Sequence, residues 1–215
     1  MNCTERVDST EEVRDALFFK SSVRNLTIRG SGIRRIPASV CGLLRLQHLD
    51  LRNNSLGVLD PDCFKRLAQL QGVFLAQNEI AKIPDHIFDN NHFLEVIDLS
   101  QNEIRFIGLH VFSNASILRN LKYVNLSDNM LTSLEPWPMI HYLINVIMLD
   151  VSNNNIKFVD PVALRQLVNA SEIRLHGNEL FLLPFDVFFI HSFNATTSII
   201  SLHNNPWSCS CNNSM

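Results

Sequence analysis

The feature that most constrains this chain is the pattern L-x-x-L-x-L-x-x-N-x-L, which fits the sequence eight times. The copies start at Val23, Leu46, Leu70, Leu94, Leu121, Val146, Ala170 and Thr197, with spacings of 23, 24, 24, 27, 25, 24 and 27 residues. A period of this length indicates a solenoid, because one repeat cannot bury its own apolar face and needs neighbours stacked against it. Positions within each repeat are counted from these starts.

Each repeat predicts one short strand followed by a turn. The segment x-L-x-L-x alternates, so its leucines point inward, and successive strands form a parallel sheet with a spacing of roughly 4.8 Å. At position nine the chain turns away, and an asparagine amide there can satisfy loop backbone groups that are otherwise buried without partners. This ladder comprises Asn54, Asn78, Asn102, Asn129, Asn154, Asn178 and Asn205. Only the first repeat departs from it, with Ser31.

A second column of large apolar residues stands at position nineteen. It comprises Cys41, Phe64, Phe88, Phe112, Met139, Leu164 and Phe188. Because the offset follows the repeat, we interpret the column as a packed spine under the convex side rather than as an aromatic platform for a ligand. Cys63 stands at position eighteen of the repeat next to that of Cys41, so the pair either forms a disulfide or leaves Cys41 as a buried thiol in the spine.

N-x-S/T sequons are more frequent than chance predicts. With 23 Asn and 25 Ser plus Thr in 215 residues, about two to three are expected, and the excess indicates passage through the secretory pathway. The ladder itself contributes part of two of them. The predicted glycosylation sites are Asn2, Asn25, Asn53, Asn114, Asn125, Asn169, Asn194 and Asn212.

The end of the chain carries the sequence Asn205-Pro206-Trp207 followed by Cys209-x-Cys211. This ending resembles the opening of the cysteine-rich C-terminal cap of extracellular leucine-rich-repeat proteins. The resemblance implies that Cys209 and Cys211 form disulfides with partners outside this chain. A metal half-site is not favoured, because no Cys or His stands nearby at zinc spacing. We therefore expect a flank or the end of a cap over 1–22, eight repeats over 23–207, and the start of a truncated cap over 208–215.

The repeat consensus, its irregular 25- and 27-residue members, the sequons and the ending together resemble Toll and Toll-like receptor ectodomains. The expected fold class is α/β, a leucine-rich-repeat solenoid shaped as a curved horseshoe, with a parallel β-sheet on the concave face and irregular or short helical segments on the convex side. The resemblance implies an innate immune receptor fragment that binds a protein or microbial ligand as a homo- or heterodimer. Signalling would pass through a TIR domain, and tethering through a membrane segment, both outside this chain.

Other extracellular proteins share these repeats and this cap, among them adhesion proteins and lamprey variable lymphocyte receptors. An adhesion or matrix protein without its own signalling is therefore the alternative. In both cases we expect the parent protein on the extracellular side of the plasma membrane or secreted. An intracellular scaffold is the third reading, since the first residues lack the apolar run of a signal peptide.

Composition and motifs exclude several other functions. The net charge of −3 and the absence of a basic run argue against a nucleic-acid partner. No H-E-x-x-H, G-x-S-x-G or phosphate loop is present, and the carboxylates are spread along the repeats. We therefore predict a binding protein that is not an enzyme, with no catalytic residue, no metal and no cofactor.

The outward strand positions contain the candidate partner site. Val96, Tyr123 and Met148 occupy position three of consecutive repeats, and Phe74 and Ile147 lie beside them. An exposed apolar patch of this kind is typical of a partner contact, although scattered apolar residues are common on any surface. A glycan on Asn125 would hang over the patch and shift binding to a flank or to dimer contacts.

Three polar groups share the same face. They are Asp50, Asp98 and Asp150 at position five, the arginines Arg24, Arg29 and Arg52, and the histidines His176 and His203 at position seven. The aspartates either attract a cation or basic partner or form a solvated face. The arginines either hold an anion or are neutralised by the aspartate among them. The histidines should face each other, as an acid sensor or as surface residues without function.

Overall fold

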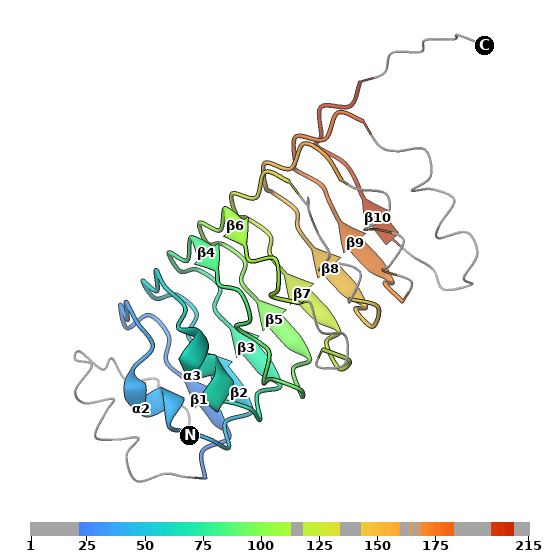
Figure 1. The fold of residues 1–215 in the computed structure, drawn as a ribbon. Helices are drawn as coiled ribbons and strands as arrows, with labels where there is room; N and C mark the ends of the chain where they lie inside the picture. Colours follow the sequence, from blue (N-terminus) through green and yellow to red (C-terminus); the bar gives the residue numbers. More distant parts are fainter. Residues whose placement is uncertain are drawn as a thin grey trace.

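The computed structural model describes residues 22–112, 118–133, 143–159, 164, 167, 169–182 and 199–208. The repeats stack along one axis, and the same side of each turn contributes a strand to one sheet (Figure 1). This eight-stranded sheet has the order β1-β2-β3-β5-β7-β8-β9-β10. Its strands are β1 (Asn25–Thr27), β2 (His48–Asp50), β3 (Gly72–Phe74), β5 (Val96–Asp98), β7 (Tyr123–Asn125), β8 (Met148–Asp150), β9 (Glu172–Arg174) and β10 (Ile199–Ser201).

Every strand covers positions three to five of its repeat, and neighbouring strands pair in parallel with equal positions opposite each other. The central residue of a strand points inward, and Leu49, Val73 and Ile97 are fully buried. The residues on either side of it face outward, as the two-residue period of a strand requires. The structure therefore confirms the parallel sheet and the inward direction of the leucines.

The opposite side of the stack is built from short elements. It contains α2 (Ala38–Cys41) and α3 (Pro61–Arg66), whereas a two-stranded parallel sheet of β4 (Lys82–Ile83) and β6 (Phe106–Ile107) lies along the flank after the asparagine turn (Figure 1). Helix α3 starts where Asp60 accepts a hydrogen bond from the backbone N–H of Asp62, with Pro61 at the first helical position. The expected short helical and irregular convex side is thus observed.

The predicted spine is packed inside the solenoid. Phe64, Phe88 and Phe112 are buried, and their ring centroids lie 5.7 Å and 6.2 Å apart in successive layers. Cys41 and Leu164 are also buried, whereas Met139 and Phe188 lie outside the described residues. Burying a phenylalanine contributes roughly 1.5–3 kcal/mol, so this column is a structural feature and not a ligand platform.

The asparagine ladder satisfies the turn that follows each strand. Asn102 donates hydrogen bonds to the carbonyl oxygens of Leu75 and Leu99 at 3.0 and 3.1 Å, and its Oδ1 accepts one from the backbone N–H of Ile80 at 3.0 Å. The same bonds to the preceding repeat recur along the stack. At the first repeat, Asn54 Oδ1 accepts the usual bond from the backbone N–H of Ile33 at 3.1 Å and a further one from that of Ser31 at 3.0 Å.

Position eight of every repeat adopts the left-handed backbone conformation. Its φ angles lie between +53° and +67° in Gly30, Asn53, Gln77, Gln101, Asp128, Asn153, Gly177 and Asn204. Glycine, asparagine and aspartate tolerate this region better than other residues and fill six of the eight positions, while Gln77 and Gln101 fill the other two. The turn that presents the end of each strand therefore has one fixed shape along the whole described stack.

Candidate functional site

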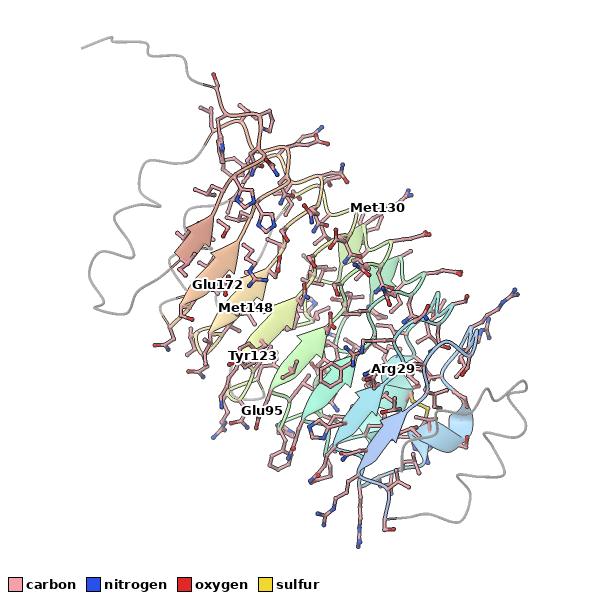
Figure 2. The ribbon with its side chains drawn as sticks, turned by 180° about the vertical axis from the view of Figure 1, so that it is seen from behind. Arg29, Glu95, Tyr123, Met130, Met148 and Glu172 are labelled. Carbon is pink, nitrogen blue, oxygen red and sulfur yellow. A yellow bond between two sulfur atoms is a disulfide. The ribbon has the colours of Figure 1, made fainter. Side chains whose placement is uncertain are left out.

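The outward face of the sheet brings the predicted apolar residues together. Val96, Tyr123 and Met148 pair in register on β5, β7 and β8. Tyr123 and Met148 lie side by side on neighbouring strands in Figure 2. Tyr123 is 40% exposed, whereas Val96, Met148 and the adjacent Ile147 are half-buried. These four residues and Phe74 are called the concave row below.

Phe74 joins this row through a glycine. A Cβ atom built on Gly72 would lie 2.9 Å from Cε2 of Phe74 and 3.0 Å from Cδ2 of His48. The phenylalanine ring therefore lies over Gly72, which is the register partner of Val96. The ring occupies the place that a position-three side chain would fill, so the apolar surface continues from Phe74 to Met148.

Arg29 after β1 and Arg52 after β2 are neutralised by the buried carboxylate of Asp50. Asp50 accepts hydrogen bonds from Nε of Arg29 at 3.0 Å and from Nε and Nη2 of Arg52 at 3.1 and 2.8 Å. Burial raises the pKa of Asp50, but the bonds from Arg52 and Arg29 outweigh it and hold the pKa at about 2. Arg52 also lies 5.3 Å from the ring centroid of Phe74. Two of the three arginines are thus engaged by Asp50 rather than poised for an anionic ligand.

A similar cluster stands near the other end of the sheet. Asp150 accepts hydrogen bonds from Oγ of Ser152 at 2.6 Å and from Nη1 of Arg174 at 3.1 Å. Arg174 also donates to Glu172 at 2.7 Å, and these bonds from Glu172 and Asp150 raise the pKa of Arg174. Asp98 accepts from Oγ of Ser100 at 2.7 Å. The aspartates of position five are therefore bound within the fold.

The two histidines of position seven do face each other. The rings of His176 and His203 stack with centroids 4.4 Å apart and an interplanar angle of 11°. The sequence predicts this contact, and its role as an acid sensor stays a prediction. A second stacked pair, His86 and His110, was not anticipated, although both residues stand at position seventeen of consecutive repeats.

The described sequons lie on or beside the concave face. Asn25 and Asn125 belong to β1 and β7, Asn53 stands in the exposed turn after β2, and Asn169 comes shortly before β9. Asn169 donates to the carbonyl oxygen of Ile144 at 2.7 Å. Asn2, Asn114, Asn194 and Asn212 lie outside the described residues.

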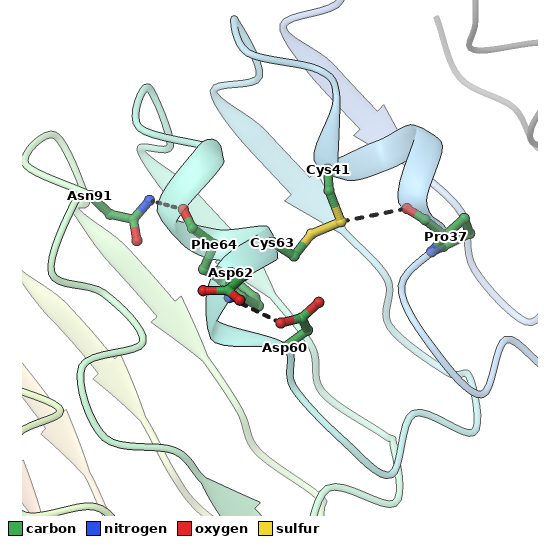
Figure 3. Close-up of a disulfide and its surroundings, with 7 residues drawn as sticks. All are labelled: Pro37, Cys41, Asp60, Asp62, Cys63, Phe64 and Asn91. Carbon is green, nitrogen blue, oxygen red and sulfur yellow. Dashed lines mark hydrogen bonds between the residues drawn. A yellow bond between two sulfur atoms is a disulfide. The ribbon is translucent and has the colours of Figure 1, made fainter.

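The two cysteines of the first repeats form a disulfide. Cys41 in α2 and Cys63 in α3 have Cα atoms 4.8 Å apart, and their sulfur atoms are joined across 22 residues (Figure 3). The dashed contact from Cys41 Sγ to the carbonyl oxygen of Pro37 is one of packing, because a disulfide sulfur has no hydrogen to donate. Cys209 and Cys211 lie outside the described residues.

Within the described ranges there is no group of three His, Cys, Asp or Glu residues that could hold a metal ion. In the same ranges, no helix has the length and apolar character that a membrane crossing requires. The described surface carries the concave row, the ion pairs of Asp50 and Asp150, and turns with the same left-handed residue at position eight.

A repeat solenoid with an outward-facing apolar row is typical of a class of proteins that act as binding scaffolds. The leucine rich repeat model matches residues 21–80, 69–122 and 119–180. This match covers more than half of the chain, which therefore belongs to the leucine-rich-repeat family.

Individual relatives are more distant. The chain is similar to human oligodendrocyte-myelin glycoprotein, with 36% identity over 92 residues, 43% of this chain and 19% of that protein. In fold it is similar to two proteins of Listeria monocytogenes, the internalin InlF and the functional domain of InlJ, at TM-scores of 0.66 and 0.61. InlF is 18% identical and InlJ 17%, with 86% and 85% of this chain covered. The chain covers 50% of the InlF chain and 34% of the InlJ chain.

Proposed function

We propose that this chain is a recognition segment of an extracellular leucine-rich-repeat protein, and that its concave row binds a protein partner when the Asn125 sequon carries no glycan. The observation that carries the proposal is the continuous apolar row from Phe74 to Met148 on an outward sheet face. Apolar and aromatic side chains of this kind supply the anchors of protein interfaces. An aromatic ring on a rigid sheet also loses little conformational entropy on binding, because it has only two side-chain torsions.

The extracellular assignment is supported by covalent chemistry. A disulfide such as Cys41–Cys63 persists in oxidising compartments and is rare in the cytosol. The excess of sequons points the same way, and the curated relative is a glycoprotein by name. Attachment to a membrane would depend on a segment of the parent protein other than the described residues.

Two parent proteins fit this scaffold. The irregular repeat lengths and the N-P-W-x-C-x-C ending support a Toll-like innate immune receptor that binds a protein or microbial ligand, forms a receptor dimer and signals through a TIR domain. The similarity to a myelin glycoprotein supports an adhesion or matrix protein without its own signalling. The coding sequence that flanks this chain distinguishes the two.

The test is a binding screen of the chain, secreted from eukaryotic cells, against an arrayed set of extracellular ectodomains. A partner found in this way is then measured against the double variant Tyr123→Ser, Met148→Ser and against the control Phe93→Ser. Phe93 is exposed to a similar degree but lies outside the sheet. We expect at least about tenfold weaker binding for the double variant and no change for the control. Equal affinities for all three proteins would overturn the proposal.

A further inference from the structure

A second apolar surface lies on the flank that follows the asparagine turn. Positions twelve and thirteen of the repeats carry large apolar side chains that are 43% to 67% exposed. They are Val58, Phe106, Phe158, Phe181 and Leu182. Met130, at position ten, is also exposed and lies beyond the edge of the sheet (Figure 2). We call the residues at positions twelve and thirteen the flank ridge.

Backbone bonds show that these positions form one continuous row. The N–H of Arg105 donates to the carbonyl of Ala81 at 3.0 Å, and the N–H of Lys157 donates to that of Thr132 at 3.2 Å. Further along, the N–H of Ser208 donates to the carbonyl of Phe181 at 2.9 Å. Each bond links position twelve of one repeat to position twelve of the next. Strands β4 and β6 lie within this row and place Lys82 opposite Phe106.

The charge of the flank ridge has one sign. Across all eight repeats, positions twelve and thirteen include Arg34, Arg35, Lys82, Arg105 and Lys157, and no Asp or Glu. Acidic residues flank these cations at position ten: Glu79 and Glu103 are exposed, and Glu179 pairs with Lys157 at 3.5 Å, so part of the positive charge is offset. The ridge therefore interleaves exposed aromatic groups with exposed cations in a chain whose net charge is −3.

The flank ridge is also free of glycosylation sequons. None of the eight sequons falls at positions ten to thirteen of any repeat. The concave face, by contrast, carries Asn25 and Asn125 on its strands. A partner that docks on the flank ridge would meet no glycan attached within it.

We propose that the flank ridge is a second docking surface, for a protein segment that combines acidic and apolar side chains. Charge complementarity selects the acidic character, since the five cations of the ridge outnumber the three glutamates at position ten beside them. The exposed phenylalanines select the apolar character, since a purely polyanionic partner such as a sulfated glycan would leave them in contact with water. This inference does not depend on which ligand the concave row binds.

The test uses a displayed library of random dodecapeptides selected on the secreted chain. The strongest peptide is then synthesised and titrated by fluorescence anisotropy at 50 and 300 mM NaCl. We expect peptides rich in Asp or Glu together with Phe, Leu or Trp, and weaker binding at the higher salt concentration. The double variant Phe106→Ser, Phe158→Ser should weaken binding about tenfold, and so should the double variant Lys82→Gln, Arg105→Gln. The controls Phe93→Ser and Tyr123→Ser, Met148→Ser should bind as the wild type does.

Five outcomes overturn the proposal. The first is that no peptide is enriched, and the second is that enriched peptides bind the ridge variants as tightly as the wild type. The third is self-association in sedimentation velocity that Phe106→Ser, Phe158→Ser abolishes, which would assign the ridge to a second copy of this chain. The fourth is ridge-dependent co-sedimentation with phosphatidylserine vesicles, which would assign it to a lipid surface. Loss of peptide binding only in the Tyr123→Ser, Met148→Ser variant would instead return the binding to the concave row.

Discussion

The ring of Phe74 lies over Gly72, two residues earlier on the same strand, and occupies the place of the missing side chain. We predict that Gly72→Ala displaces the ring and lowers the free energy of unfolding by about 1–3 kcal/mol. Gly57→Ala is the control, because its added Cβ would meet nothing closer than 3.9 Å and should be neutral or slightly stabilising. Urea unfolding followed by circular dichroism measures both. Equal stability of the two variants would show that the ring does not need the glycine.

The asparagine ladder predicts an asymmetric response to alanine. Asn102→Ala removes four bonds and leaves the buried N–H of Ile80 without its acceptor, so we expect a loss of about 2–4 kcal/mol in unfolding free energy. Asn120→Ala removes one exposed bond, to the carbonyl of His92, and should cost below about 1 kcal/mol. Thermal and urea denaturation compare them. Similar losses of unfolding free energy for the two variants would contradict a special contribution of the asparagine ladder to stability.

Two glycines at position eight, Gly30 and Gly177, allow the cost of backbone strain to be measured apart from the cost of a steric clash. A Cβ on Gly177 would lie 2.1 Å from Oδ1 of Asn153, whereas one on Gly30 would have 3.5 Å to its nearest neighbour. Both glycines have positive φ, so Gly30→Ala should cost about 1 kcal/mol and Gly177→Ala about 1–2 kcal/mol more. Adding Asn153→Gly to Gly177→Ala should recover most of the difference, because glycine removes the Oδ1 contact without adding left-handed strain at position 153. A Gly177→Ala variant as stable as Gly30→Ala would refute the contact.

The cluster around Asp50 predicts a stability change in acid. Its pKa is about 2 in the folded protein against an ordinary value of 3.8, so the contribution is fully present above about pH 4 and is lost as the pH falls towards 2. We expect it to be about 1–2 kcal/mol, since both arginines are partly exposed. Unfolding free energies of the wild type and Asp50→Asn at pH 5 and pH 2.5 should converge at the lower pH. A constant difference between them would exclude this origin.

Much of the fold follows from the column pattern of the sequence. The pattern places the strands at positions three to five, Asn102 in the ladder and Phe88 in the spine, because each depends on one position repeating. It does not predict the ring of Phe74 over Gly72, since that contact joins two different positions of a single strand. The disulfide of Cys41 and Cys63 stays open in the sequence, because its geometry depends on two short helices that no column specifies.

In the candidate site, too, the repeat pattern predicts some contacts and only the packed structure shows the others. The neighbours Tyr123 and Met148, and the pair His176 and His203, follow directly from equal positions in adjacent repeats. The sequence does not predict the flank ridge, because its exposed apolar residues alternate with charged and small ones and position thirteen therefore has no uniform composition. An exposed Phe106 and a buried Phe112 are the same residue type, and only the packed structure separates them.

Recognition by the concave row is tested most directly by placing a glycan inside it. The variant Val96→Asn, Asp98→Thr creates a sequon on β5, and mass spectrometry of the secreted protein reports its occupancy. With a protein partner from the ectodomain screen, we predict that the occupied variant no longer binds, and that trimming the glycan to a single sugar restores most of the affinity. Unchanged binding by the fully occupied variant would contradict recognition through this row.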